Sequence, residues 1–371
     1  MGQTSRIIQV GTAKIGGGLP ILLQSMAATK TTDIVKTVET CQRLTDAGAG
    51  LVRVAVDTLH DAEALRAIRK QTTANLSVDL QENYRLAEIA APFVDKIRYN
   101  PGHLHHAEPG TAWQTKVERI VQTVRQHDCA LRIGVNCGSL DPALTTPAPP
   151  QEGNNIDAAI QSALQHAEFV DSLNFDRFCV SIKSSDPKAV LFANRQFAAK
   201  RPDVPIHLGL TEAGLPPDGI EKSRAALEPL LVEGIGDTLR VSLTVPNDRK
   251  AEEIEAGRLI VNNVAAGTVL TDWQPKCVNI ISCPSCARVE NEQFVMLAEQ
   301  VREAVGSMEV PLTIAVMGCR VNGPGETDHA DIGLWCGKTS VNLKRGSTLI
   351  GSFDYGEVID KMMDMIVKPQ L

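Results

Sequence analysis

Apolar and polar positions follow two different periods along the first two-thirds of the chain. Short runs of apolar and β-branched residues are each followed by a longer segment in which apolar residues recur every three to four positions. Continuous apolar runs are typical of strands in a parallel sheet, and the longer period is typical of amphipathic helices. The pattern therefore predicts repeated β–α units between residues 20 and about 266. The expected strands are Ile21–Met26, Leu51–Val56, Leu76–Leu80, Lys96–Asn100, Leu131–Asn136, Phe178–Lys183, Pro205–Leu210 and Thr238–Leu243.

Helical segments separate these strands. Asp33 and Asp186 stand immediately before two of them, where an aspartate side chain can cap the first free backbone N–H groups. Eight successive β–α units predict an α/β fold of the TIM (β/α)8 barrel type, and a doubly wound open sheet is the alternative. The clearest helical segments are Asp33–Ala47, Thr58–Gln71, Lys116–His127, Asp186–Lys200 and Lys250–Asn262.

The composition changes near Ala265–Pro275. Beyond this point, cysteine-containing turns surround one helical segment at about Glu290–Val305. We therefore predict two domains, a barrel over residues 1–266 and a small α+β domain over residues 267–371. Ser139–Asn155 is rich in Pro, Thr and Gly, and we expect a long loop there, where barrels often carry functional segments.

Hydropathy and net charge indicate where the protein is located and which partners it can bind. No stretch of ~18 consecutive apolar residues is present, so no membrane-spanning helix is expected. The first residues lack an apolar leader run, and we expect a soluble, cytoplasmic protein. The formal net charge of −7 argues against a nucleic-acid partner, because phosphate neutralisation needs a basic surface. A local basic pocket for a small anion is compatible with that charge.

Five of the nine cysteines fall within the last hundred residues. A cytosolic chain of this size is not expected to form disulfides, so the crowding indicates a metal or cluster site. Cys283 and Cys286 have the C-x-x-C spacing, and Cys319 precedes a glycine-rich turn that ends at Glu326. We favour an iron–sulfur cluster, because one weak oxygen ligand would let a substrate reach one iron.

The spacing leaves the fourth ligand of this site open. A structural zinc ion is the alternative to a cluster, and zinc would normally be enclosed by cysteine or histidine. That alternative favours Cys336 or His329, whereas a reactive cluster favours an oxygen ligand. The candidates are Glu326, Cys336, Cys277, His329 and an open position.

Basic and polar side chains gather at the carboxyl ends of the predicted strands, where TIM barrels have their active sites. Residues two apart in a strand share a face, so Arg98 lies with Asn100, and Arg240 with Ser242. Charges inside a barrel need partners, and guanidinium groups match phosphate oxygens in pairs. We therefore predict an anion site suited to a diphosphate. Its expected residues are Arg53, Arg98, Asn100, Arg132, Asn136, Lys183, Arg240 and Ser242.

Asp79 and Glu212 are the expected inward-facing carboxylates. Each is either an ion-pair partner of the basic residues or an acid–base group, and both roles stay open. His207 lies within the seventh strand, where a core and a functional histidine are equally expected. We expect the other histidines to be solvated, with His60, His127 and His166 on helix surfaces and His103, His105 and His106 in a polar loop over His103–Gly110.

These segments together resemble one family, the 4-hydroxy-3-methylbut-2-en-1-yl diphosphate synthases of the non-mevalonate isoprenoid pathway. The resemblance covers nearly the whole chain, with the length of the short bacterial form. It departs after the third strand, where Gln81 replaces the usual histidine. The matching motifs include Gln24-Ser25-Met26, Asn100-Pro101-Gly102, Arg132-Ile133-Gly134-Val135-Asn136, Gly209-Leu210-Thr211-Glu212, Gly236-Asp237-Thr238-Leu239-Arg240, Cys283-Pro284-Ser285-Cys286 and Gly323-Pro324-Gly325-Glu326.

The resemblance implies a barrel followed by an iron–sulfur domain similar to part of sulfite reductases. It also implies a homodimer in which the cluster domain of one subunit caps the barrel of the other. The implied cofactor is a 4Fe–4S cluster held by Cys283, Cys286, Cys319 and Glu326. We predict Glu326, Glu212 and Asp79 as catalytic residues.

The implied activity is that of an oxidoreductase acting on CH or CH2 groups. The substrate would be 2-C-methyl-D-erythritol 2,4-cyclodiphosphate, opened and dehydroxylated to 4-hydroxy-3-methylbut-2-enyl diphosphate. Two electrons would come through the cluster from flavodoxin or ferredoxin. The alternatives are a barrel lyase or transferase for a phosphorylated substrate with a structural zinc domain, and an electron-carrier module.

Overall fold

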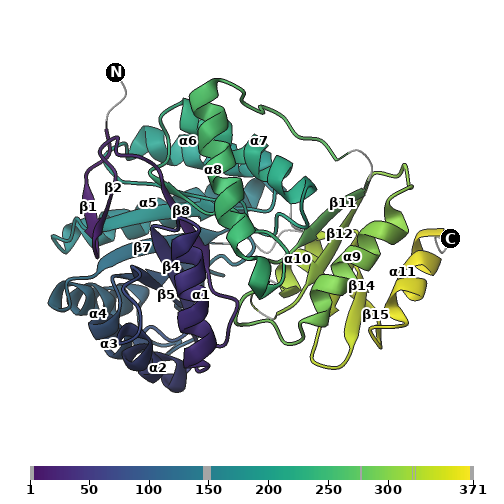
Figure 1. Ribbon diagram of the computed structural model, residues 1–371, viewed down its shortest axis with the longest axis horizontal. Helices are drawn as coiled ribbons and strands as arrows, with labels where there is room; N and C mark the ends of the chain where they lie inside the picture. The colour runs from purple at the N-terminus through teal and green to yellow at the C-terminus, as the bar shows by residue number, and fades with distance from the viewer. Residues whose placement is uncertain (1–3, 145–151, 276–277, 320, 322, 368–371) are drawn as a thin grey trace.

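The computed structural model describes residues 4–144, 152–275, 278–319, 321 and 323–367, which form two bodies that meet along one face (Figure 1). The last helix of the larger body ends at Ala266, and the first strand of the smaller body begins at Val278. Each body has an apolar core of its own. Within these described ranges, no helix combines the length and the apolarity needed to cross a bilayer.

Eight parallel strands form the larger body. Their order in the sheet is β8-β7-β6-β5-β4-β3-β10-β9, and a parallel bridge between Val180 and Ile206 joins its two edges. The sheet is therefore a closed barrel, which confirms the predicted TIM fold and excludes the open sheet. The strands are β3 (Leu22–Met26), β4 (Leu51–Val56), β5 (Leu76–Leu80), β6 (Lys96–Tyr99), β7 (Ala130–Asn136), β8 (Phe178–Lys183), β9 (His207–Leu208) and β10 (Thr238–Leu239).

Helices cover the outside of the barrel (Figure 1). Asp33 accepts a hydrogen bond from the backbone N–H of Lys36, and Asp186 accepts from those of Lys188 and Ala189, so both predicted caps are confirmed. The helices are α1 (Ile34–Asp46), α2 (Leu59–Arg69), α3 (Leu86–Ala90), α4 (Trp113–Gln126), α5 (Glu152–Ser172), α6 (Pro187–Lys200), α7 (Asp218–Val232) and α8 (Ala251–Ala266).

The loop predicted over Ser139–Asn155 ends earlier than expected, because helix α5 begins at Glu152. Glycine and asparagine in its first turn are weak helix formers, so helix propensity does not predict where the helix begins. The helix is instead stabilised by the apolar face that follows, including Ile156, Ala159 and Ile160, which packs on the barrel.

A hairpin near the N-terminus was not predicted. Its strands β1 (Ile8–Val10) and β2 (Ala13–Ile15) pair in antiparallel fashion. They form a small apolar cluster with Leu51 and Ala130, which are the first residues of β4 and β7. The hairpin therefore closes the end of the barrel opposite to the carboxyl ends of the strands.

The smaller body is a five-stranded mixed sheet with helices, which agrees with the predicted α+β domain. Its strand order is β11-β12-β13-β14-β15, with β11 to β13 parallel and the last two strands antiparallel. The strands are β11 (Val278–Ser282), β12 (Leu312–Met317), β13 (Ile332–Cys336), β14 (Val341–Arg345) and β15 (Thr348–Phe353), and the helices are α9 (Gln293–Val305), α10 (Gly323–His329) and α11 (Val358–Val367).

The smaller domain lies over the carboxyl ends of the barrel strands of its own chain. Ala213, just beyond β9, makes a parallel bridge with Ser282 at the end of β11. The Thr244 hydroxyl lies 2.5 Å from that of Ser282, and Lys222 donates a 2.8 Å hydrogen bond to Asn279. Within this chain, the cap meets the barrel through direct backbone pairing. The homodimer, with the cap from a partner subunit that the family resemblance implied, stays a prediction.

Candidate active site between the barrel and its cap

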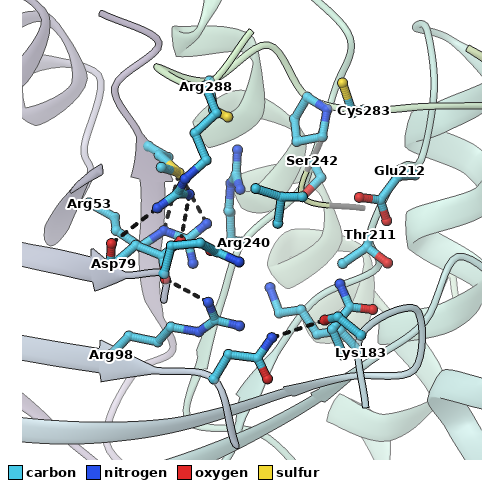
Figure 2. A pocket seen from close by; sticks show the side chains of 18 of the residues that line it. Arg53, Asp79, Arg98, Lys183, Thr211, Glu212, Arg240, Ser242, Cys283 and Arg288 are labelled. Atoms are coloured by element: carbon cyan, nitrogen blue, oxygen red, sulfur yellow. Dashed lines mark hydrogen bonds and ion pairs between the residues drawn. The ribbon is translucent and has the colours of Figure 1, made fainter. Parts of the chain in front are cut away.

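One cavity lies between the mouth of the barrel and the smaller domain (Figure 2). Its barrel wall contains every basic, polar and acidic residue that the strand ends predicted. Its other wall contains three cysteines of the smaller domain. The barrel residues are Arg53, Asp79, Arg98, Asn100, Arg132, Asn136, Lys183, Glu212, Arg240 and Ser242, and the cap residues include Cys283, Cys286, Arg288 and Cys319.

Strand register holds the barrel residues side by side. Asp79 on β5 is directly opposite Arg98 on β6, and Arg98 is opposite Arg132 on β7. Glycines leave room for the long side chains, because a Cβ added at Gly134 would overlap the Arg98 guanidinium, and one at Gly209 would overlap the Lys183 ammonium. The barrel wall is therefore set by backbone geometry before any ligand binds.

Two of the cations in the mouth have carboxylate partners. Arg98 donates a 2.6 Å hydrogen bond to Asp79 and a 2.8 Å bond to the Gly134 carbonyl. Arg240 pairs with Glu253 at 3.2 Å, and that buried carboxylate also accepts from Lys250 at 2.9 Å. Arg98 and Arg240 are thus partly neutralised by the protein.

Glu253 was missed in the sequence analysis. It lies on α8, three residues after Lys250, and on the same helical face as the buried Gly257 and Ile260. The spacing of four and then three residues predicts that Glu253 shares the buried face of the helix, so its carboxylate points toward the barrel.

Three other cations have no carboxylate within hydrogen-bonding range among the described residues. The Arg53 guanidinium donates to the Met26 sulfur at 3.1–3.2 Å. Two guanidinium nitrogens of Arg132 are buried without a partner in the described part of the chain. Burial lowers the pKa of Arg132 to about 10 and, with the neighbouring arginines, holds the pKa of Lys183 well below its usual range. The mouth therefore carries surplus positive charge that an anion would offset.

Asp79 is an ion-pair partner in this site. Burial alone would raise its pKa, but Arg98, Arg53 and Arg288 outweigh burial and hold the pKa of Asp79 well below its usual range. The group is therefore a carboxylate at neutral pH. Of the two roles that the sequence left open for Asp79, ion-pair partner and acid–base group, this geometry supports the ion-pair partner.

Glu212 occupies a different environment. It is buried and has a positive φ of 49°, a backbone conformation that costs energy in a side-chain-bearing residue. Burial, followed by the nearby Glu212 carboxylate, raises the pKa of Glu326 to about 8. The Ser185 hydroxyl donates a 3.0 Å hydrogen bond to Glu326. Two carboxyl groups from the two domains thus approach each other at one side of the cavity.

The three cysteines of the cap converge from two loops. The backbone N–H of Gly318 donates to the Cys283 sulfur at 3.2 Å. A hydrogen bond from Cys319 lowers the pKa of Cys286 to about 6, while burial raises that of Cys283. All three are free thiols. Three adjacent thiols are a suitable donor set for three ligand positions of an iron–sulfur cluster, and the Glu326 carboxyl lies at the barrel mouth, next to Ser185 and Glu212.

The other candidates for the fourth ligand lie elsewhere. Cys336 is buried in β13, within the apolar core of the smaller domain. His329 is exposed and lines a different surface cavity, near Asp186. Cys277 lies outside the described residues. Of the described alternatives, Glu326 is the one beside the barrel mouth.

Two histidine predictions were wrong. His103 is buried, with its Nδ1 hydrogen-bonded to the Gln81 amide, so it supports the cavity rim instead of being solvated. His166 is also buried, because its ring packs 4.1 Å from Trp113 and its Nδ1 lies 3.0 Å from the Tyr99 hydroxyl. Both side chains fill gaps created by distant segments, which local periodicity does not reveal.

Arg288 is the second functional candidate that was missed. It follows Cys286 by two residues, and its side chain reaches Asp79 in the barrel (Figure 2). Its position two residues after Cys286 was the feature of the sequence that could have marked it as a site residue. The ion-pair partner could not be read from the sequence, because it lies more than two hundred residues away.

Comparisons with known proteins agree with these features. The family described as GcpE TIM-barrel domain matches residues 5–258, and the GcpE protein C-terminal domain matches residues 279–368. A protein of Rhodopirellula baltica named 4-hydroxy-3-methylbut-2-en-1-yl diphosphate synthase (flavodoxin) is 56% identical over 96% of this chain and 94% of its own length. Proteins of the same name from Cellvibrio japonicus and Nitratiruptor are 41% and 38% identical, covering 91% and 97% of this chain and 85% and 96% of their own lengths.

Proposed function

Because the chain belongs to the 4-hydroxy-3-methylbut-2-en-1-yl diphosphate synthase family, we propose that it reduces 2-C-methyl-D-erythritol 2,4-cyclodiphosphate to 4-hydroxy-3-methylbut-2-enyl diphosphate. It is an oxidoreductase of isoprenoid precursor biosynthesis. The observation that carries the proposal is the cavity itself, because surplus cations face three thiols across it. A diphosphate site and a redox site are thereby combined.

The barrel wall would hold the diphosphate. Arg53, Arg132 and Lys183 supply positive charge without a close carboxylate among the described residues, and Arg98 and Arg240 are oriented by their own ion pairs. Guanidinium groups match phosphate oxygens in pairs, and burial strengthens each contact. Asn100, Asn136 and Ser242 lie on the same wall and would add neutral hydrogen bonds.

The cap would hold a 4Fe–4S cluster through Cys283, Cys286, Cys319 and Glu326. When bound, such a cluster supplies electrons one at a time and a Lewis-acidic iron. The Gly318 N–H would remain hydrogen-bonded to a ligand sulfur, which tunes its electron density. The Ser185 hydroxyl would orient the Glu326 carboxylate.

Proton supply would come from Glu212, the carboxyl group at the side of the cavity that is not assigned to the cluster. Glu212 lies close to Glu326, because it contributes to the raised pKa of that residue in the free protein. We assign proton donation to Glu212, and we assign Asp79 the role of a permanent countercharge. The closed cap excludes water from the cavity during reduction.

The proposed setting is the cytoplasm, with flavodoxin or ferredoxin as electron donor and a homodimer as the assembled form. The names of the three relatives include flavodoxin, which supports that donor. In the proposed homodimer, the cap of one subunit would lie over the barrel of the other, in the place that the cap of the same chain takes here.

Anaerobic purification followed by turnover tests the proposal. We expect a brown protein with about four iron and four sulfide ions per chain. It should convert the cyclic diphosphate when a low-potential reductant is added. A colourless protein with zinc would instead identify a barrel lyase or transferase. An electron carrier would also be brown, but its spectrum would not change when the cyclic diphosphate is added, and it would make no product.

A further inference from the structure

Three side chains that can bind a metal ion meet at the rim of the barrel mouth. They are Glu82, in the segment after β5, and His103 and His106, in the loop after β6. One ligand atom of each residue lies within 4.8 Å of those of the other two. Two imidazoles and one carboxylate are a common donor set for zinc, and three such ligands leave a fourth position for water.

The imidazole of His103 is in the form that binds a metal. It is buried, and burial, followed by the charge of Arg98, lowers the pKa of His103 to about 3. The ring is therefore neutral at neutral pH, as a metal ligand must be. Arg98 is itself paired with Asp79 at 2.6 Å, so its charge only partly opposes a cation at this place.

Gln81 occupies the other ring nitrogen of His103. Its side-chain amide is hydrogen-bonded to Nδ1, which leaves Nε2 for a metal. The amide presents its nitrogen here, and a half-turn of the amide presents its oxygen as the acceptor for Nδ1–H. A histidine that binds metal through one nitrogen commonly donates its other N–H to such an oxygen, which fixes the ring. Gln81 also lines the cavity, so this contact links the three ligands to the cavity wall.

The two histidines are held at an angle to each other. Their ring centroids are 5.3 Å apart with an interplanar angle of 78°, and the backbone N–H of His106 donates to the His103 carbonyl at 3.2 Å. The ring of His105 packs 4.0 Å from that of His106. The turn therefore brings both imidazoles to the same side, and His105 supports the more exposed one.

A buried lysine fixes the loop that carries these histidines. The Lys116 ammonium donates to the carbonyls of Leu104 at 2.7 Å, Ala107 at 2.6 Å and Glu108 at 2.9 Å. These three contacts span the residues on either side of His106. Ligands on a loop that is already held in place lose little conformational freedom when a metal binds.

We propose that Glu82, His103 and His106 form a zinc site at the rim of the barrel mouth, with Gln81 as the residue that orients His103. The site belongs to the barrel alone, so it does not depend on which subunit supplies the cap. It uses none of the residues assigned to the diphosphate or to the cluster. Zinc binding requires no turnover, and the proposal is therefore independent of the proposed function.

Zinc titration of the anaerobically purified full chain tests the site, with calorimetry for affinity and zinc-edge X-ray absorption for the ligands. Wild type should bind about one zinc ion per chain more than His106→Ala, whatever the cysteines hold, and this ion should have nitrogen and oxygen ligands without sulfur. His106 is exposed, so its loss should leave the fold intact. Glu82→Gln should weaken the same binding by at least about 100-fold. Equal zinc content and affinity in wild type and His106→Ala would overturn the proposal.

Two controls separate this ligand set from other histidines. His60 lies 3.6 Å from Glu63 on an exposed helix surface, so His60→Ala removes a histidine–carboxylate pair of a different place and should keep the zinc ion. His105→Phe retains a ring against His106 but no ring nitrogen, and it should keep the ion as well. A loss in either variant as large as that in His106→Ala would show that the ligands are wrongly assigned.

Gln81 has a test of its own. Gln81→Leu removes the hydrogen bond to His103 and should weaken zinc binding by about tenfold. Gln81→Glu provides an oxygen that can only accept from Nδ1–H, and it should bind zinc at least as tightly as wild type. Weakening by both variants to the same extent would refute the orienting role of Gln81.

Discussion

The two walls of the cavity are built in different ways. On the barrel wall, side chains project from parallel strands whose register fixes them, as in the row Asp79, Arg98 and Arg132. On the cap wall, Cys283, Cys286 and Cys319 project from loops that follow β11 and β12. The comparison indicates that strand register organises the barrel wall, whereas loop conformation organises the cap wall. Damage to one wall should therefore leave the other wall working.

The largest effect is expected on the cap wall, from Cys319→Ser. Loss of one thiol ligand should remove the intact cluster, and turnover should fall at least ~10³-fold. The barrel wall should persist, so inorganic pyrophosphate should bind with an affinity within about threefold of wild type, measured by calorimetry. Cys336→Ala is the control, because that thiol lies in the domain core and should be dispensable for iron. Native iron content in Cys319→Ser would refute the assignment.

On the barrel wall, Arg132→Met should give the reverse result. We expect kcat/KM for the cyclic diphosphate to fall by about 100-fold, because a buried phosphate contact is worth roughly 2–5 kcal/mol. Iron content should not change. The melting temperature should hold or rise, since the substitution removes a buried cation that is only partly paired. A marked loss of stability would show that Arg132 serves the fold more than the ligand.

The sequence predicted the residues of the barrel wall better than it predicted the residues that hold them in place. Side chains two apart in a strand share a face, so Arg98 and Asn100 could be located from a local rule. The burial of His103 depends on contacts between segments distant in the chain, and so does the pairing of Arg288 with Asp79. The spacing of the cysteines indicated a cluster, but the choice of Glu326 needed the family resemblance, because spacing does not distinguish ligands across a domain interface.

Glu253→Gln tests a residue that the sequence did not reveal, the carboxylate that pairs with Arg240 beneath the anion site. Breaking its buried pair with Arg240 and Lys250 should lower the free energy of unfolding by about 3 kcal/mol at pH 7. Burial would raise the pKa of Glu253, but Arg240 and Lys250 outweigh it and lower the pKa to about 2. The contribution is present above the unfolded pKa and lost as the pH falls toward 2, so the two proteins should converge in acid.

Denaturant titrations of the apo-protein between pH 7 and pH 3 would measure this convergence. Glu252→Gln is the matched control, because its carboxylate pairs with Arg249 in an i,i+3 contact in which both side chains are partly exposed. Such a pair is worth roughly 0–1 kcal/mol. An equal loss in both variants would show that Glu253 has no special role beneath the anion site.

The smallest effect is expected at the bottom of the barrel, from Lys96→Met. Lys96 is fully buried and donates a 3.4 Å hydrogen bond to Gln24, and burial lowers its pKa to about 7. Between that value and the pKa of the unfolded chain, only the unfolded state binds the proton, so stability rises with pH and is lost as the pH falls toward 7. Wild type should therefore gain about 2 kcal/mol relative to Lys96→Met between pH 7 and pH 9.

This last variant also contrasts the two ends of the barrel interior. Lys183 and Lys96 are both buried with lowered pKa values, but only Lys183 lines the cavity. Saturating pyrophosphate should favour the charged form of Lys183 and leave the pH slope due to Lys96 unchanged. Lys36→Met, at an exposed helix position, should keep the wild-type slope. If pyrophosphate altered the Lys96-dependent slope, the anion site would extend through the barrel, and the distinction between its mouth and its bottom would be lost.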